Sequence, residues 1–213
     1  MEPGGGLRER KKAATRRALH EAAVALTLEH GLDRVTVEAI ADAAMVSRRT
    51  FSNYFGGKEQ ALLYDDRCQM DRLVGMVRAR PETDSAWQAL TAAAVELCAD
   101  LGDPERLARM RAMRRHPSLL SEQIALFAAT EADLAEAVAA RLPDPDPLRA
   151  RLMAAAYMAA LRVASHRWLE EHPDIPLTDE VTAALATMAE PFESGPPEPG
   201  PPRSSPSGSG SFE

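Results

Sequence analysis

Residues 35–63, VTVEAIADAAMVSRRTFSNYFGGKEQALL, carry the local signals that decide the fold of this chain. Thr36 and Ser47 are each suited to begin a helix, because a hydroxyl oxygen at the N-cap accepts a hydrogen bond from a free backbone N–H of the first turn. A valine precedes each of them and a large apolar residue follows four positions later, as in a hydrophobic staple. Only the residues AAMV at 43–46 separate the two helices. The segment therefore predicts a helix, a tight turn and a second helix.

The rest of the chain also has the composition of a helical protein. Ala, Leu, Glu and Arg dominate, and no segment shows the alternating β-branched pattern of a strand. We therefore predict an all-α protein of about nine helices. Besides the two helices of the quoted segment, glycine and proline residues delimit helices near 11–30, 58–80, 85–101, 104–115, 119–142, 148–172 and 178–190.

Three parts follow from this pattern. Residues 1–63 form an N-terminal arm and the helix-turn-helix unit, residues 64–190 form a helical body, and residues 191–213 form a tail. Between positions 194 and 211, 16 of 18 residues are Gly, Pro or Ser. A segment of this composition buries too little apolar surface to offset the cost of ordering it, so we expect the tail to be disordered.

Composition and charge exclude several classes of protein. No run approaches the roughly 18 consecutive apolar residues of a membrane span, and the N-terminus lacks the apolar region of a secretory signal, so we expect a soluble, cytoplasmic protein. Cys68 and Cys98 alone cannot form a disulfide framework or a cysteine zinc site. The formal net charge is -7, yet residues 1–63 carry ten basic and eight acidic residues. A small basic end on an acidic body suits local contact with phosphates rather than indiscriminate coating of nucleic acid.

The second helix of the quoted segment has one apolar and one polar face. At about 100° per residue, Phe51 and Phe55 share one direction and should point into the core, while Arg49 and Asn53 point away from it. Arginine can pair with guanine and asparagine with adenine in the major groove. Arg48 falls near the core direction, but its long side chain in the first turn can still reach outward.

Other residues around this helix fit contact with phosphates. Thr36 and Lys58 each stand at a helix N-terminus, where free N–H groups favour an anion, and Tyr54 offers a hydroxyl at the rim. Six basic residues precede the unit and would track the adjacent DNA backbone as an arm: Arg8, Arg10, Lys11, Lys12, Arg16 and Arg17. The alternatives are a solvated helix face and a flexible basic tail.

The quoted segment resembles a known family in three places. TVEAIADAA at 36–44, VSRRTFSNYF at 46–55 and K-E-x-A-L at 58–62 are similar to the DNA-binding domain of the TetR family of transcriptional regulators, and Ala25-Leu26 followed by Gly31 completes the likeness. The base-reading residues that this resemblance implies are Arg48, Arg49, Ser52 and Asn53. The phosphate-binding residues that it implies are Thr36, Thr50, Tyr54 and Lys58. Ser52-Asn53 and Gly56-Gly57 replace bulkier or more aromatic residues common in the family, so no base preference is carried over.

The resemblance also implies a body that dimerises through its last two long helices and binds a small ligand. Residues 148–168 are rich in alanine, which lets helix axes approach closely, and Val181, Leu185 and Met188 form an apolar stripe on the last helix. The alternative is that both helices belong to the core of a single chain. The expected partners are double-stranded DNA, a second copy of the chain and a small-molecule effector, with no membrane.

Candidate pocket residues are apolar side chains on several helices of the body, which a plain core would equally require. They are Trp87, Met110, Met113, Phe127 and Tyr157. Five arginines between 106 and 115 form either a solvated face or a site for an anionic ligand. Residues 106–168 also loosely resemble TetR regulators with an acyl-CoA-type ligand domain, which implies an acyl thioester as effector.

Patterns typical of enzymes are incomplete. His166 and Glu170 stand four residues apart with His172 nearby, a spacing that can bind a metal, but no H-E-x-x-H motif completes it, and an exposed helix end explains it as well. The sequence also has no glycine-rich phosphate loop and no nucleophile elbow. We therefore predict a protein without catalytic residues, metal or cofactor.

Our interpretation is a ligand-responsive repressor. Two subunits place their third helices in successive major grooves of a palindromic operator, and an effector releases them by favouring the conformer that does not bind DNA. The alternative is a helical small-molecule-binding or interaction protein without sequence-specific DNA binding.

Overall fold

The computed structural model describes residues 4–99, 116–144, 146–171 and 175–193. Within these ranges the chain has nine α-helices, two 3-10 turns and no strand. The prediction of an all-α protein is confirmed. The helix expected near 104–115 and the Gly, Pro and Ser-rich segment at 194–211 lie outside the described residues.

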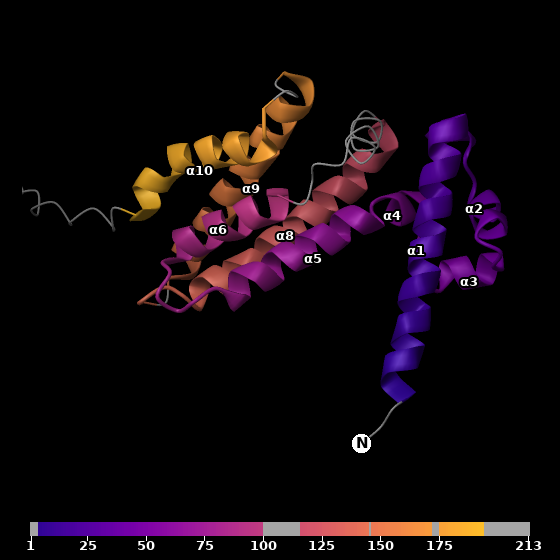
Figure 1. Cartoon of the computed structure of the whole chain (residues 1–213), viewed down its shortest axis with the longest axis horizontal. Coiled ribbons are helices and arrows are strands. Elements are labelled where there is room, and N and C mark those ends of the chain that lie inside the picture. Colours follow the sequence, from indigo (N-terminus) through magenta and orange to yellow (C-terminus); the bar gives the residue numbers. More distant parts are fainter. Residues whose placement is uncertain (1–3, 100–115, 145, 172–174, 194–213) are drawn as a thin grey trace, which may run out of the picture.

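Three helices and a 3-10 turn form the N-terminal end of the molecule (Figure 1): α1 (Gly4–His30), η1 (Leu32–Arg34), α2 (Val37–Ala43) and α3 (Arg48–Ser52). Both expected N-caps are present. The Thr36 hydroxyl accepts a hydrogen bond from the Ala39 N–H at 3.1 Å, and the Ser47 hydroxyl accepts one from the Thr50 N–H at 3.0 Å. Met45 makes the turn between α2 and α3 with a φ of 54°. The helix-turn-helix thus forms where its local signals place it.

Helix boundaries differ from the prediction at three points. Helix α1 begins at Gly4 rather than near residue 11, because the residues that follow the glycines are strong helix formers. Helix α3 ends at Ser52, before the Gly56-Gly57 pair that would otherwise mark its end in the sequence. The single helix expected from Lys58 is interrupted at Leu63, whose ψ of 10° separates α4 (Lys58–Leu62) from α5 (Tyr64–Ala79).

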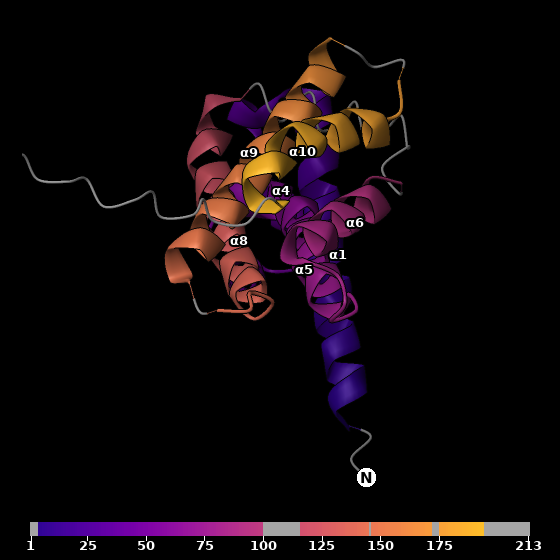
Figure 2. The same cartoon turned by 90° about the vertical axis from the view of Figure 1, so that its left-hand side faces the viewer.

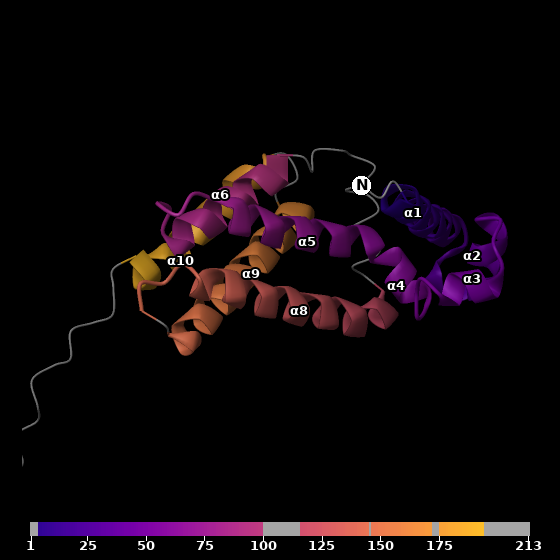
Figure 3. The ribbon, with the colours of Figure 1, turned by 90° about the horizontal axis from the view of Figure 1, so that it is seen from below.

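Five further elements build the body: α6 (Ala86–Ala99), η2 (Pro117–Leu119), α8 (Leu120–Ala139), α9 (Pro147–Glu170) and α10 (Leu177–Glu193). Helices α5 and α8 run side by side, and α9 packs against both α8 and α10 (Figure 3). Residues 191–193, which the sequence assigned to the tail, form the last turn of α10. Every boundary of α6, α8, α9 and α10 lies within three residues of the one predicted.

Two separate groups of buried side chains form the core. The first joins α1, α2, α3 and α4 around Phe51, and it includes Leu119 from η2 of the body. The second fills the body, where the Trp87 and Tyr157 rings meet edge to face with centroids 6.4 Å apart. Val181 and Leu185 are buried in this second core. Val181 and Leu185, two of the three residues of the apolar stripe on α10, therefore pack into the interior of their own subunit.

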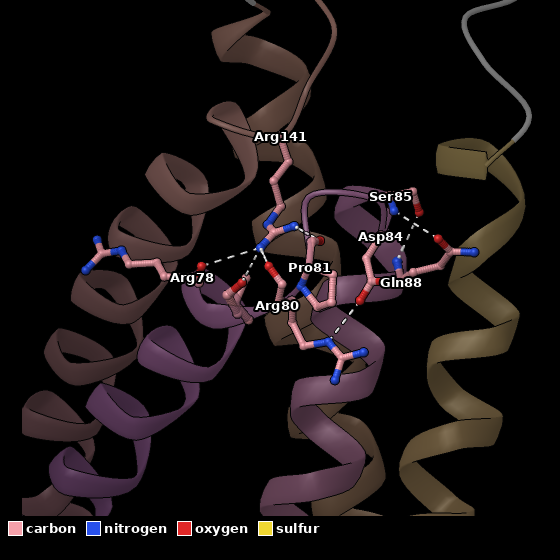
Figure 4. A network of polar contacts seen from close by, with 8 residues as sticks. Arg78, Arg80, Pro81, Asp84, Ser85, Gln88 and Arg141 are labelled. Carbon is pink, nitrogen blue, oxygen red and sulfur yellow. Dashed lines mark hydrogen bonds and ion pairs between the residues drawn. The ribbon is translucent and has the colours of Figure 1, made fainter.

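A single arginine links the ends of α5 and α8 (Figure 4). Arg141 lies just after the end of α8. Its guanidinium donates hydrogen bonds to the carbonyls of Val77 at 2.9 Å, Arg80 at 2.7 Å and Pro81 at 2.9 Å. The last carbonyls of a helix have no partner within it, so this side chain satisfies the C-terminus of α5. It fixes the far end of the body, away from the helix-turn-helix.

Candidate nucleic-acid interface and ligand cavity

Helix α3 turns its polar side outward, as predicted. Phe51 and Phe55 are buried with their ring centroids 5.8 Å apart, and they anchor the helix to the first core. Arg49, Ser52 and Asn53 are exposed. Three of the four residues expected to read bases therefore lie together on an open surface of donors and acceptors.

Arg48 is also exposed, but it makes an ion pair with α2. Its Nη1 atom lies 3.0 Å from Glu38 Oε1, and both side chains are mainly in solvent. Exposed pairs of this kind contribute about 0–1 kcal/mol, so the pair is readily exchanged for another partner. Contact between Arg48 and a base would require this exchange.

The residues expected to hold phosphates lie in three different settings. Thr36 is exposed, and its hydroxyl caps α2. Thr50 is half-buried, and its Oγ1 atom lies 2.9 Å from the hydroxyl of Ser47. Tyr54 is half-buried beneath the guanidinium of Arg16, which lies 5.7 Å from the centre of the ring. These residues frame the outward face of α3.

Lys58 has a role inside the domain that the sequence did not reveal. Its ammonium donates hydrogen bonds to the carbonyls of Leu32 at 2.9 Å and Val35 at 3.0 Å. These bonds tie the segment before α2 to the start of α4, and they use two of the three N–H groups. From sequence alone a lysine at a helix start looks the same whether it holds a phosphate or a loop.

An aromatic contact joins the helix-turn-helix to α5. Tyr64 begins α5, and its ring packs edge to face against His20 of α1, with centroids 5.9 Å apart, and against Phe55, with centroids 5.7 Å apart. Nδ1 of His20 lies 2.9 Å from the carbonyl oxygen of Ala61, which makes it a donor there. Burial raises the pKa of Tyr64, which keeps its hydroxyl neutral. The sequence did not reveal this contact, because His20 lies more than 30 residues before Phe55 and Tyr64 and only the fold brings the three rings together.

A second contact joins η2 and α8 to the helix-turn-helix. Leu119 is fully buried in the first core. The Nε2 atom of His116 lies 3.3 Å from Asp33 Oδ1 in η1, and Gln60 Nε2 of α4 lies 3.5 Å from Glu122 Oε1 of α8. The N-terminal end of α8 is therefore attached to the DNA-binding end of the molecule.

A cavity of about 480 Å³ lies in the body beside this contact. Its apolar lining comes from Leu63, which precedes α5, and from α5, α6, α8, α9 and α10. It includes Leu63, Met70, Leu97, Leu120, Ile124, Phe127, Met158 and Leu161. The charged or titratable side chains in its wall are Asp66, Arg162, His166 and Cys98. Burial raises the pKa of Cys98 to about 11, so this residue presents a neutral thiol at physiological pH.

The five expected pocket residues divide into three groups. Phe127 lines the cavity. Trp87 and Tyr157 lie in the core of the body and not in the cavity wall, because their rings pack against each other. Burial raises the pKa of Tyr157 well above its ordinary value. Met110 and Met113 lie outside the described residues, as do the five arginines of 106–115.

The metal site considered from the sequence is not assembled in the described part of the chain. There, no three His, Cys, Asp or Glu side chains come close enough to hold a metal ion. His172, the third residue of the expected group, lies outside that part, and His166 instead lines the cavity. No helix among the described residues is long and apolar enough to cross a membrane.

Two family models match this chain. Residues 19–64 match the bacterial regulatory proteins of the tetR family, and residues 84–193 match the MftR C-terminal domain of TetR regulators. A curated relative, the HTH-type transcriptional regulator TcmR of Streptomyces glaucescens, is 33% identical over 175 residues, which are 78% of this chain and 77% of that protein.

Solved structures share the fold. The complex of SmeT with triclosan is similar with a TM-score of 0.59 and 22% identity over 83% of this chain and 90% of that one. FadR of Thermus thermophilus with lauroyl-CoA is similar with a TM-score of 0.53 and 22% identity, over 83% and 94% of the two chains. Together with the family matches, these findings show that the chain is a helix-turn-helix transcriptional regulator and belongs to the TetR family.

Proposed function

We propose that this regulator represses transcription as a homodimer on a palindromic operator, and that a small, largely apolar effector in the cavity releases it. One observation supports a link between the cavity and the DNA-binding end. Leu63 belongs to the core of the DNA-binding end and also lines the cavity, and the neighbours Leu119 and Leu120 belong to that core and to the cavity wall, respectively. A ligand that moves the wall therefore moves residues on which α3 rests.

An apolar face on α9 supports the homodimer. Leu148, Leu152 and Val163 are 67%, 55% and 46% exposed, and the half-buried Ala155 and Ala159 lie between them on the same side of the helix. Such a face is costly to leave in water, and small residues at its centre let a second helix approach closely. A helix as short as α3 reads few base pairs, so two subunits related by a two-fold axis read a palindrome.

Release of DNA follows from a shift between two conformers. The effector would bind the conformer in which α5 and α8 hold the two α3 helices at a spacing that does not match successive major grooves. To shift the equilibrium between the two conformers by a given free energy, the effector must bind this conformer more tightly than the DNA-binding conformer by at least that free energy. The attachment of His116, Leu119 and Glu122 to the DNA-binding end supports this route of transmission.

The lining favours a neutral, mostly apolar effector. A cavity of about 480 Å³ lies within the range of small-molecule sites, roughly 300–1,000 Å³. Arg162 and His166 are the basic residues in the described wall, and Asp66 opposes them with an acidic group. Triclosan and lauroyl-CoA, present in the SmeT and FadR structures, represent two effector chemistries to compare. We expect the neutral phenol to stabilise this protein more than the polyanionic thioester does.

The test begins with selection of bound duplexes from a random-sequence library at near-physiological salt. We expect a palindromic consensus, a dimer by sedimentation, and release of the selected duplex by a ligand that also raises the melting temperature. Arg49→Ala should weaken binding roughly 5- to 150-fold and relax the preference at one base position in each half-site. Arg67→Ala, which removes an exposed charge on α5, serves as the control and should leave the affinity and the base preference unchanged. Selection without a consensus would favour the alternative, a binding module that does not read DNA.

A further inference from the structure

The basic segment before the helix-turn-helix is a continuation of α1 rather than a separate tail. Helix α1 begins at Gly4, and its N-terminal half projects alone beyond α2 and α3 (Figures 1 and 2). Residues 6–14 are exposed throughout. Their exposure means that no packing inside the subunit explains the sequence of this segment.

The helical geometry divides the six basic residues of this segment between two faces. Arg8, Lys12 and Arg16 follow one another at intervals of four residues, so they lie on one side of α1. Arg10 and Arg17 lie on the opposite side, about 180° around the helix from Arg8. Lys11 stands at the edge of the first group.

Two contacts show what each side faces. The guanidinium of Arg16 lies over the ring of Tyr54, at the C-terminal end of the recognition helix. Arg17 instead lines a shallow crevice with Asp65 of α5, on the side of the body. The face formed by Arg8, Lys12 and Arg16, called the cationic rail below, therefore extends the DNA-facing side of the molecule.

The cationic rail combines free charges with a helical backbone. Neither Arg8 nor Lys12 makes an ion pair with a described carboxylate, and Arg16 uses the face of an aromatic ring. At a rise of 1.5 Å per residue the rail spans about 12 Å, which corresponds to roughly three to four base pairs of duplex. Because the segment is already helical, binding along it costs less conformational entropy than ordering a flexible arm.

We propose that the cationic rail binds the DNA backbone next to the base pairs read by α3, on the side of Tyr54. Each subunit then covers about three to four base pairs of flanking duplex without reading their sequence. This inference rests on the proposed function, because it requires that α3 binds duplex DNA. Arg10 and Arg17 stand outside the contact.

The test compares two duplexes that contain the palindrome selected from the random library. One ends at the last base pair of the consensus, and the other extends about ten base pairs beyond it on each side. Affinity is measured by fluorescence anisotropy between 50 and 300 mM salt. The wild-type protein should bind the longer duplex more tightly. Its affinity for that duplex should also depend more steeply on salt: the slope of log affinity against log salt concentration should be steeper by about 0.9 for each additional phosphate contact.

Arg8→Ala/Lys12→Ala should remove this advantage of the longer duplex, with a loss of roughly tenfold or more at 150 mM salt. Arg10→Ala/Arg17→Ala has the same change of charge on the opposite face and should keep the advantage. Alanine preserves the helix, which circular dichroism at 222 nm verifies. If Arg8→Ala/Lys12→Ala still binds the longer duplex more tightly, or if both variants lose this preference, the proposed contact of the cationic rail with DNA is wrong while the proposed function stands. If wild-type protein selects no consensus duplex, the proposed function fails and the rail with it.

Discussion

The two ends of this molecule are held together in different ways. At the DNA-binding end, short helices are fixed by hydroxyl caps, by the Lys58 bonds and by aromatic rings around Phe51. In the body, long helices pack around a cavity through aliphatic side chains together with the rings of Trp87 and Tyr157, and Arg141 fixes the end farthest from DNA. The difference places rigidity where bases are read and adjustable space where a ligand binds. A ligand-responsive regulator needs this division, because a bound ligand must change the body without melting α3.

The largest expected effect comes from the core of the DNA-binding end. Phe51→Ala removes a fully buried ring, and such changes cost about 3–5 kcal/mol. We expect the helix-turn-helix to unfold and specific DNA binding to be lost, while the body stays folded. Anisotropy with the selected duplex and thermal unfolding followed by circular dichroism measure the two outcomes.

Phe127→Ala is the matched change in the body. It enlarges the cavity, so it should weaken the response to ligand and leave affinity for the duplex within about threefold, because a half-buried side chain at a cavity wall loses less on truncation. If Phe51→Ala kept specific binding, α3 would not be the reading element. If it unfolded the whole chain in one transition, the two ends would not be separable.

Arg141 tests how the far end of the body is fixed. Arg141→Ala leaves the Arg80 carbonyl without the donor shown here and removes the charged hydrogen bonds to the Val77 and Pro81 carbonyls, which keep the N–H groups of Arg80 and Asp84 as donors. We expect the free energy of unfolding to fall by about 3 kcal/mol. Urea denaturation of the full chain measures this change. Arg78→Ala is the control, because Arg78 makes only an exposed ion pair to Glu136 at 3.7 Å and should cost less than about 1 kcal/mol. Equal losses in both variants would refute the role of Arg141.

Lys58 separates a structural role from a DNA-binding role. If its two bonds to the Leu32 and Val35 carbonyls are its main function, Lys58→Ala should lower the free energy of unfolding by about 2 kcal/mol. If it holds a phosphate, the same change should flatten the salt dependence of binding by about one unit. We expect the first effect to be the larger one. An unchanged melting temperature with a flatter salt dependence would restore the phosphate role.

Much of the DNA-binding end could be predicted because its determinants are local. Thr36 and Ser47 cap helices that begin one residue later, and the spacing of Phe51 and Phe55 is enough to identify the buried face of α3. The role of Lys58 could not be predicted, because its partners at Leu32 and Val35 precede it by 26 and 23 residues. Only the fold brings them together.

The cavity was less predictable because the wall of a cavity and a packed core are built from the same types of apolar residue. Trp87, Phe127 and Tyr157 are all large aromatic side chains on helices of the body, yet only Phe127 faces the space. Val181 and Leu185 formed a clear apolar stripe, but periodicity cannot tell whether a stripe packs within one chain or between two. The exposed face of α9 became visible only when the packing of α8 and α10 against it was known.

The smallest expected effect comes from Met45, in the turn between α2 and α3. Met45 is 93% exposed and adopts a φ of 54°, a conformation that costs a residue with a side chain roughly 1–2 kcal/mol and costs glycine almost nothing. Met45→Gly loses no packing, but glycine also gains freedom in the unfolded chain, so we expect a net stabilisation of about 0.5–1 kcal/mol. Met45→Ala is the control and should leave the melting temperature nearly unchanged, since alanine keeps the strained φ. A loss of stability in the glycine variant would mean that the methionine side chain, rather than the backbone of this turn, sets the angle between α2 and α3.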